Sequence, residues 1–416
     1  MQDIEVHVDL DGRAQRVGLL RRQTARGRLD AVTFEYDDSW LANDARFALE
    51  PALQLGPGVF ASSAADGRMF GAFADSAPDS WGRRLIQRAE RRQAAREGRR
   101  VRTLGEVDYL LGVSDVARLG ALRLRGADDA EFQAPSASGV PALIELPRLL
   151  RSALLIERDE DTDDDLQTIL APGASLGGAR PKASVIDDGH LWMAKFPKES
   201  DEYSLETWEE IAFRLADGSG IETPDHRLVR VRGRHVLLSR RFDRTGQVRI
   251  PFLSALAMTG SRDGERGSYP ELADALARHG ADAKAQTAAL FRRMAFNVLI
   301  SNVDDHLRNH GFLMQDLTGW VLSPAYDLNP TPADLKARIL TTNIDIDDGT
   351  CSLDLVESVA PYFGLALGGA RRIIKEVAVS VARWRGVAAA AGVSIRQADR
   401  LASAFEHEDL RRALAL

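Results

Sequence analysis

Residues 302–309 read Asn302-Val303-Asp304-Asp305-His306-Leu307-Arg308-Asn309, and the fold prediction starts from this stretch. An aspartate and an asparagine stand here with four residues between them, which is the D-x-x-x-x-N spacing of kinase catalytic loops. In that pattern Asp304 accepts the proton of a hydroxyl group and Asn309 holds a metal ion. An ordinary solvated loop is the alternative for either residue taken alone.

The residues on both sides of this stretch favour the same interpretation. The apolar spacing from 290 to 300 predicts a helix before the loop. Two short strands are expected after it, over 311–314 and 320–322, joined by a turn at 316–319. They lead to Asp327, at the point where kinases place a metal-binding aspartate. The order of helix, loop, hairpin and aspartate therefore predicts phosphoryl transfer.

A lysine and a glutamate upstream complete the expected set. Lys195 lies within an apolar strand and resembles the lysine that pairs with ATP phosphates in kinases, although a strand-end lysine reaching solvent is the alternative. In the helix expected over 205–216, Glu209 lies inside the apolar face, whereas Glu206 and Glu210 project away from it. Because a carboxylate on a buried face needs a partner, we expect Glu209 to pair with Lys195.

A glycine-rich segment precedes these residues, with the sequence SLGGARPK over 175–182. Paired glycines, Gly177 and Gly178, allow backbone N–H groups to approach phosphates closely. Lys182 could add a positive charge at the same place. The alternative is a simple turn with a lysine nearby.

Composition limits the class of protein. The chain has 416 residues, of which 44% are hydrophobic and 28% charged, as in globular proteins of two or three domains. The single cysteine, Cys351, excludes an intramolecular disulfide and a thiolate metal cage. Neither a signal peptide nor an apolar run of membrane-spanning length is visible, so we expect a cytoplasmic protein without membrane contact.

Charge is distributed unevenly along the chain. The net charge of −7 argues against a free-standing nucleic-acid binder. Residues 83–102 nevertheless carry nine arginines, which indicates either a solvated helix or a patch that touches nucleic acid or an acidic partner within a complex. The acidic run over 157–165 is expected to be a solvated loop that leads into a helix.

The order of patterns along the chain predicts an α+β fold. We expect a bilobal, protein-kinase-like architecture with a small N-terminal domain of mixed sheet and helix and a mainly helical C-lobe. The predicted divisions are an N-terminal module over 1–125, a linker over 126–147, a kinase N-lobe over 148–244 and a C-lobe over 245–416. The linker is placed where Ala, Ser, Pro and Gly are abundant.

Taken together, these motifs resemble those of the HipA-like serine/threonine kinases, the toxin halves of bacterial toxin–antitoxin pairs. The C-terminal half carries the similarity in FNVLISNVDDHLRNHGF, PAYDLNP, SRRFDR and SLGGARPK. The N-terminal part carries it in SWLAND, FADSAPDSWGRRL and GALRL, so the resemblance covers nearly the whole chain. Two positions depart from the family: Arg308 replaces the usual lysine, and Arg180-Pro181 varies within the glycine-rich segment.

The resemblance implies ATP and Mg²⁺ as cofactors, with Asp304 as catalytic base and with Asn309 and Asp327 on magnesium. It also implies autophosphorylation of Ser175, which would move the glycine-rich segment away and inactivate the enzyme. His306 is expected to hydrogen-bond within the catalytic loop. The residues grouped around the nucleotide are Gly177, Gly178, Ala179, Lys182, Lys195, Arg240, Arg241, Phe242, His306, Asn309 and Asp327.

The same resemblance implies two kinds of partner. One is a protein substrate, since some relatives phosphorylate aminoacyl-tRNA synthetases. The other is a small DNA-binding antitoxin, through which DNA is contacted only indirectly. Two alternatives stay open: a small-molecule kinase of the same bilobal fold, and a module that binds the antitoxin with little or no catalysis.

Overall fold

The computed structural model describes residues 2–23, 31–62, 69–133, 140–170 and 178–416. The chain divides into two compact units, both of which contain helices and strands. The first unit comprises Met1–Glu199, Arg230–Arg234 and Arg240–Leu253, and the second comprises Ser200–Val229, His235–Ser239 and Ser254–Leu416. Neither unit ends at the predicted linker, so the domain boundaries given above stay a prediction.

A five-stranded sheet begins the first unit, in the order β4-β3-β2-β1-β5. Its strands are β1 (Gln2–Leu10), β2 (Arg13–Gln23), β3 (Ala31–Tyr36), β4 (Val59–Ala61) and β5 (Leu122–Gly126). Ile4, Val6 and Val8 are buried on one face of β1, as their alternation with polar residues predicts. The turn between β1 and β2 is made by Asp11 and Gly12, which both have positive φ, as two-residue hairpins require.

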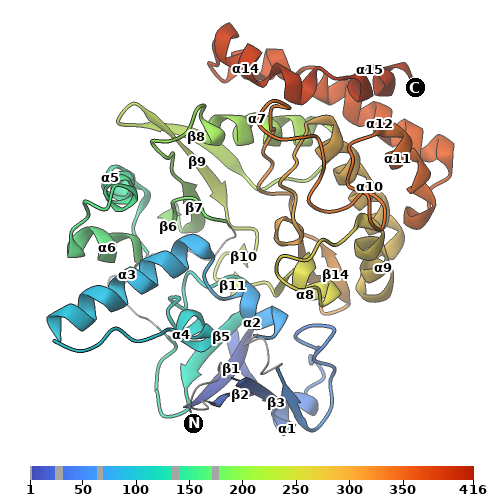
Figure 1. The fold of residues 1–416 in the computed structure, drawn as a ribbon. Helices are drawn as coiled ribbons and strands as arrows, with labels where there is room; N and C mark the ends of the chain where they lie inside the picture. Colours follow the sequence, from blue (N-terminus) through green and yellow to red (C-terminus); the bar gives the residue numbers. More distant parts are fainter. Residues whose placement is uncertain (1, 24–30, 63–68, 134–139, 171–177) are drawn as a thin grey trace. The chain divides into compact units, whose positions relative to one another are not determined.

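Helices and a second hairpin complete the first unit (Figure 1). The hairpin consists of β6 (Lys182–Asp187) and β7 (His190–Lys195), paired antiparallel. The helices are α1 (Asp38–Leu41), α2 (Gly71–Asp75), α3 (Ser80–Arg96), α4 (Glu106–Leu111), the 3₁₀ turn η1 (Leu143–Glu145), α5 (Leu146–Glu157) and α6 (Asp163–Leu170). The short strands are β10 (Arg244–Thr245) and β11 (Val248–Arg249).

The positive charge of the arginine-rich helix α3 is largely neutralised by the acidic run over 157–165, which was predicted to be a solvated loop. Arg88 and Arg92 both form ion pairs with Asp161, whose side chain is fully buried. Arg92 and Arg96 also reach Asp163 at the start of α6. The two runs therefore bind one another, which corrects the prediction that the acidic run is simply solvated and leaves less of α3 for a nucleic-acid partner.

This pairing can be tested by comparing the same substitution at two aspartates, Asp161 and Asp164. Asp161→Asn should lower the free energy of unfolding by about 2 kcal/mol, because two guanidinium groups lose a buried partner while keeping some solvent contact. Asp164→Asn removes the same charge from an exposed side chain that pairs with the exposed Arg148, and should change stability little. Urea unfolding followed by tryptophan fluorescence compares the two, and equal losses would contradict the pairing.

The second unit is mainly helical. Its helices are α7 (Leu205–Gly218), α8 (Ala255–Thr259), α9 (Tyr269–His279), α10 (Ala283–Leu299), η2 (Leu307–Asn309), α11 (Leu353–Ser358), η3 (Ala360–Phe363), α12 (Leu367–Val381), α13 (Trp384–Ala390), α14 (Ile395–Phe405) and α15 (Glu408–Ala415). Helix α10 packs against α9 and α12 (Figure 1). Trp208 on α7 contacts Trp384 and Phe405, whose rings stack with their centroids 4.7 Å apart.

The strands of the second unit include the hairpin that the sequence predicts. It consists of β13 (Gly311–Gln315) and β14 (Gly319–Leu322), which pair antiparallel across a turn with positive φ at Asp316 and Leu317. The remaining strands, each of which has residues in both units, are β8 (His226–Val231), β9 (Arg234–Arg240) and β12 (Phe252–Ser254). Within the described ranges, the helices all fall short of the length and apolar character that crossing a membrane requires.

Candidate active site

The stretch 302–309 lies where α10 ends and before β13 begins, in the order that the sequence predicts. Helix α10 is buried along most of its last two turns, and Ile300 follows it as the C-cap. Ser301 has a φ of 53°, so the chain turns sharply out of the helix there. The final three residues of the stretch form the 3₁₀ turn η2, which passes directly into β13.

The two adjacent aspartates of this stretch have opposite environments. The side chain of Asp304 is 64% exposed, and Lys336 Nζ lies 3.5 Å from its Oδ1. Asp305 is only 1% exposed. An exposed carboxylate can meet an incoming hydroxyl group, whereas a buried carboxylate has to be satisfied by donors within the protein.

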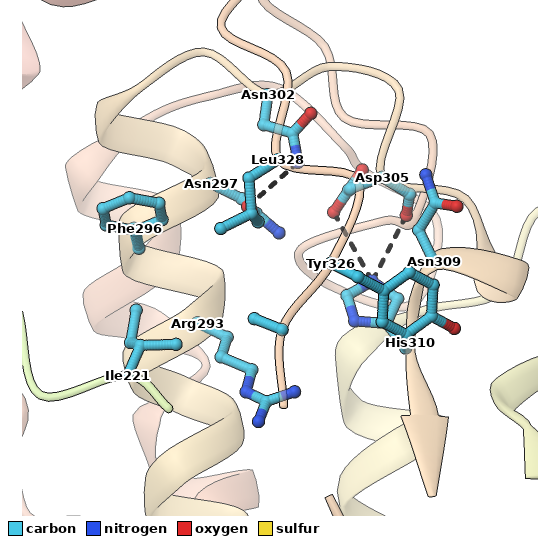
Figure 2. A pocket seen from close by; sticks show the side chains of 11 residues that line it. Ile221, Arg293, Phe296, Asn297, Asn302, Asp305, Asn309, His310, Tyr326 and Leu328 are labelled. Atoms are coloured by element: carbon cyan, nitrogen blue, oxygen red, sulfur yellow. Dashed lines mark hydrogen bonds and ion pairs between the residues drawn. The ribbon is translucent and has the colours of Figure 1, made fainter. Parts of the chain in front are cut away.

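Asp305 receives those donors from two distant segments. The hydroxyl of Tyr269 donates to Oδ2 at 2.7 Å, and the backbone N–H groups of Thr341 and Thr342 donate to Oδ1 at 3.1 and 3.3 Å. His310 lies beside the same residue, with Nε2 3.3 Å from its carbonyl oxygen (Figure 2). Asp305 thereby fixes the backbone on which Asp304 stands.

Asn309 has one satisfied and one unsatisfied side-chain atom. Its Nδ2 donates to the carbonyl oxygen of Asp304 at 2.9 Å, which ties the two ends of the loop together. Its Oδ1 is buried, and none of the residues that the structure describes donates a hydrogen bond to it. A buried amide oxygen without a donor suits a cation ligand, so the residue fits Mg²⁺.

Asp327 follows β14 in the segment Pro324–Pro330 and has a φ of 54°, which is unusual for a residue other than glycine. Its backbone N–H donates to Oε1 of Glu209 on α7 at 3.1 Å. The hydroxyl of its neighbour Tyr326 donates to the carbonyl oxygen of Arg308 at 2.7 Å. The segment 324–330 is therefore hydrogen-bonded to the stretch 302–309 through Tyr326 and to α7 through Asp327.

The described residues contain no group of three or more His, Cys, Asp and Glu side chains that could hold a metal ion. Magnesium, however, is commonly bound through one or two carboxylates together with substrate phosphates and water. The carboxylate of Asp327 and the amide oxygen of Asn309 would be the protein ligands of such an ion. Their chemistry fits Mg²⁺ better than it fits a transition metal.

Helix α7 differs from the prediction in one respect. Glu209 is buried as expected, at 3% exposure, but Glu206 and Glu210 are buried too, at 2% each. Glu210 Oε2 lies 2.6 Å from Nδ1 of His226 on β8, and its Oε1 accepts from Arg214. The expectation that Glu206 and Glu210 project away is wrong, since both are buried, and for Glu210 it is His226 on β8 that supplies a polar partner.

The first unit holds the remaining predicted residues. Lys195 is half-buried at the end of β7, and its pairing with Glu209, which belongs to the second unit, stays a prediction. Lys182 stands opposite Lys195 in the hairpin and is only 2% exposed. Its Nζ forms an ion pair of 2.6 Å with Asp79, the N-cap of α3. The carbonyl oxygen of Ala179 accepts from Arg84 of the same helix at 3.0 Å.

Gly178 has a φ of 108°, a conformation that favours glycine. Ser175 and Gly177 lie outside the described residues. The carbonyl oxygen of His306 accepts from the backbone N–H of Asn309 at 2.7 Å, and a role for the His306 side chain stays a prediction.

Two charged residues of the motif SRRFDR, Arg241 and Asp243, are buried and form an ion pair. Arg241 is 2% exposed and binds the buried carboxylate of Asp243 through Nε and NH2, at 2.7 and 2.6 Å. Its NH1 donates to the carbonyl oxygen of Ala117 at 3.0 Å. Although burial alone would raise the pKa of Asp243, the neighbouring guanidinium groups of Arg241 and Arg244 hold it far below its usual range. The side chain of Arg241 therefore anchors the loop after α4, and its assignment as a nucleotide contact stays a prediction.

Arg240 and Phe242, on either side of Arg241 in that motif, were also predicted to lie near the nucleotide. Arg240 lies 3.0 Å from Nδ1 of His190 through NH2, and Phe242 contacts the ring of Phe252. Both side chains are partly accessible. Their proximity to a nucleotide stays a prediction.

Sequence reasoning missed several residues that shape the site. Lys336 beside Asp304 comes from a loop with no motif, and Tyr269 begins α9 far upstream of the loop. Asn297, Asn302 and His310 were visible as polar residues among apolar ones, which is a weak signal for buried hydrogen bonding. Asn297, Asn302, Asp305, Asn309 and His310 all line a pocket of about 10 Å³, which is room for about one water molecule (Figure 2).

Two family models match the chain. Residues 7–108 match the HipA N-terminal domain, and residues 174–385 match the HipA-like C-terminal domain. The chain belongs to the HipA-like family. This confirms the resemblance that the motifs indicated in both halves of the sequence.

Individual relatives are more distant. The chain is 29% identical over 211 residues to the putative kinase Y4dM of Sinorhizobium fredii, which covers 42% of this chain and 50% of that protein. It is 26% identical over 195 residues to a putative kinase of Haemophilus influenzae, covering 40% and 57%. This HipA-like chain thus spans about half the length of the curated relatives it matches.

A solved structure covers almost the whole chain. It is a chain from the Shewanella oneidensis complex of HipA, HipB and operator DNA, with a TM-score of 0.67 and 18% identity over 99% of this chain and 96% of that one. Similarity at this level of identity shows a shared fold. The predicted α+β class is therefore confirmed.

The buried ion pair between Asp79 and Lys182 yields a test of the role of Lys182. Asp79→Asn keeps the helix cap but leaves a buried ammonium without its carboxylate, and should lower the free energy of unfolding by about 3 kcal/mol. Adding Lys182→Met should recover a large part of that loss, because both charges are then gone. Thermal unfolding of the two variants measures this.

The double variant also isolates the nucleotide prediction for Lys182. If Lys182 contacts ATP, the Asp79→Asn/Lys182→Met protein should bind a fluorescent ATP analogue more weakly than the wild type does, although its stability has recovered. Unchanged affinity would restrict Lys182 to the ion pair with Asp79.

Proposed function

We propose that this HipA-like protein is an ATP-dependent kinase that transfers the γ-phosphoryl group to a serine or threonine hydroxyl of a protein. The observation that carries the proposal is the difference in solvent exposure between two neighbouring aspartates. Asp305 is buried and its carboxylate accepts hydrogen bonds from Tyr269, Thr341 and Thr342, while Asp304 is exposed on the same loop. The putative kinases among the relatives support the same reaction class.

The residues of the second unit suit the steps of phosphoryl transfer. Asp304 would accept the proton of the attacking hydroxyl group, since its carboxylate is open to solvent. Asn309 Oδ1 and the carboxylate of Asp327 would hold Mg²⁺, which neutralises phosphate charge when it is bound. The link between Asn309 and the Asp304 carbonyl keeps base and metal ligand in a fixed relation.

The first unit would supply the nucleotide contacts. Lys195 would bind the phosphates, with Glu209 orienting it, and the glycine-rich segment would cover them. Phosphorylation of Ser175 would add about −1.5 to −2 charges beside an anionic nucleotide, and the repulsion would lower ATP affinity. Autophosphorylation is thus proposed as an off-switch for the enzyme.

The proposed partners follow from the family. The solved relative is part of a complex with HipB and operator DNA, and we propose a small DNA-binding antitoxin for this chain as well. Contact with DNA would be made through that antitoxin. The substrate would be a cytoplasmic protein, with an aminoacyl-tRNA synthetase as a candidate class.

The proposed base and metal ligand are tested by isosteric substitution. Asp304→Asn and Asp327→Asn should each lower phosphoryl transfer at least about 100-fold, because one removes the proton acceptor and the other a metal ligand. The melting temperature should stay close to that of the wild type. The measurement is radiolabel transfer from ATP to the protein itself and to casein as a general acceptor.

Asp316→Asn is the matched control, since it removes the same charge from an exposed turn of the same unit. Its activity should equal that of the wild type. Full activity of Asp304→Asn would end the assignment of this residue as base, and labelling of a small metabolite alone would favour the small-molecule kinase.

Two glutamates one residue apart on α7 give a second test. Glu209→Ala removes the acceptor of the Asp327 N–H, and should lower kcat together with the melting temperature, because a backbone donor is left without its partner. Glu210→Ala removes the buried partner of His226, and should lower the melting temperature while leaving kcat per folded molecule unchanged. The reverse pattern in kinetics and thermal melts would disprove the role given to Glu209.

A further inference from the structure

A chain of hydrogen bonds runs through the interior of the second unit, from the segment of Asp327 to the catalytic loop. The backbone N–H of Asn329 donates to Oδ1 of Asn302 at 3.1 Å, and Nδ2 of Asn302 donates to Oδ1 of Asn297 at 3.1 Å. Nδ2 of Asn297 then donates to the hydroxyl of Tyr269 at 2.9 Å, and that hydroxyl donates to Asp305 at 2.7 Å. Figure 2 shows the Asn302–Asn297 bond and the nearby carboxylate of Asp305.

The direction of this chain follows from its first member. A backbone N–H can only donate, so Asn302 has to present its oxygen to Asn329 and its NH₂ group to Asn297. Asn297 in turn presents its oxygen to Asn302 and its NH₂ group to Tyr269. The proton of the Tyr269 hydroxyl is then left for Asp305, which is an acceptor in its ionised form.

Burial makes every link of the chain matter. Tyr269 is 0% exposed, and Asn297, Asn302 and Asp305 are 3%, 1% and 1% exposed. Water cannot readily replace a lost partner at such positions, and hydrogen bonds in series polarise one another. Burial first, and the negative charge of Asp305 second, raise the pKa of Tyr269 well above its ordinary value, so its hydroxyl keeps its proton.

The two ends of the chain lie beside the groups proposed for chemistry. Asn329 is two residues after Asp327, and Asp305 follows Asp304 directly. Of the intermediate members, Tyr269 begins α9 and Asn297 lies on the last turns of α10, while Asn302 opens the stretch 302–309 itself. Two helices therefore support the chain between its ends. A shift of either segment would break at least one buried bond.

We infer that Tyr269, Asn297 and Asn302 are positioning residues, which act as one network that holds the Asp304 base in register with the Asp327 metal ligand. The inference rests on the proposed phosphoryl transfer for its kinetic consequences. It goes beyond that proposal because it assigns a function to residues that do not touch nucleotide, metal or substrate.

The first test is Tyr269→Phe, which removes one oxygen atom and keeps the ring. It should lower kcat for radiolabel transfer about tenfold while KM for ATP stays within twofold, since nucleotide contacts are not altered. Tyr36→Phe is the matched control, because the hydroxyl of Tyr36 is also buried and donates to a carbonyl oxygen at 2.6 Å, but in the first unit. It should lower the melting temperature without a change in kcat.

A double-mutant cycle tests whether the residues act as one network. Asn297→Ser should lower kcat in the same direction, and the double variant Tyr269→Phe/Asn297→Ser should lose little more than either single variant. Losses that multiply would overturn the network, as would a kcat for Tyr269→Phe within twofold of the wild type.

Hydrogen–deuterium exchange tests the same coupling without turnover. Tyr269→Phe should raise exchange of backbone amides in 302–309 and in 326–329 together, whereas Tyr36→Phe should raise neither. Unchanged exchange in both segments would overturn the inference. A wild type without transfer activity, combined with the expected exchange pattern, would reject the kinase proposal and still support the network.

Discussion

The burial of the Asp305 carboxylate is the constraint on which the candidate site depends. A buried carboxylate is costly unless donors surround it, and this one takes them from the start of α9 and from the backbone of 341–342. Its carbonyl oxygen is bound as well, by the hydroxyl of Thr342 and by His310. Because the residue is held from several sides, its neighbour Asp304 can stand exposed without becoming mobile. Rigid support and an open functional group are thus provided by adjacent residues of the same type.

Local patterns explain why much of this arrangement was predictable. The apolar spacing before residue 300 and the turn at 316–319 are properties of neighbouring residues, and they placed α10, the β13–β14 hairpin and Asp327 in the correct order. The D-x-x-x-x-N spacing singled out Asp304 rather than Asp305, and the exposure of the two side chains agrees with that choice. Helix α7 shows where such reasoning ends. A single apolar face predicted one buried glutamate, whereas the helix buries three, and one of the unexpected ones, Glu210, has its partner in His226 on β8.

Partners far apart in the sequence could not be predicted from it. Tyr269 and Asp305 are separated by 36 positions, and Lys182 and Asp79 by 103. The arginines of α3 and the acidic run after α5 were each visible as a cluster of charge, but nothing in either cluster indicated that they neutralise one another. Ion pairing across such distances depends on how the elements pack, and no periodicity encodes it. For the same reason Arg241, which stands in a recognisable motif, turned out to anchor a loop.

These comparisons suggest a physical criterion for separating chemistry from support. Asp305 and Arg241 are charged and buried, and their side chains form several hydrogen bonds with other groups of the protein. Asp304 and Asn309 differ, since the carboxylate of Asp304 is largely exposed and the buried amide oxygen of Asn309 has no donor within the described part of the chain. A polar group whose hydrogen-bonding positions are already occupied cannot easily bind a substrate or an ion, whereas a group with an unoccupied position can. Both kinds of residue occur within the same eight positions, so a motif match alone does not identify the functional atoms. The hydrogen-bond inventory of each atom does.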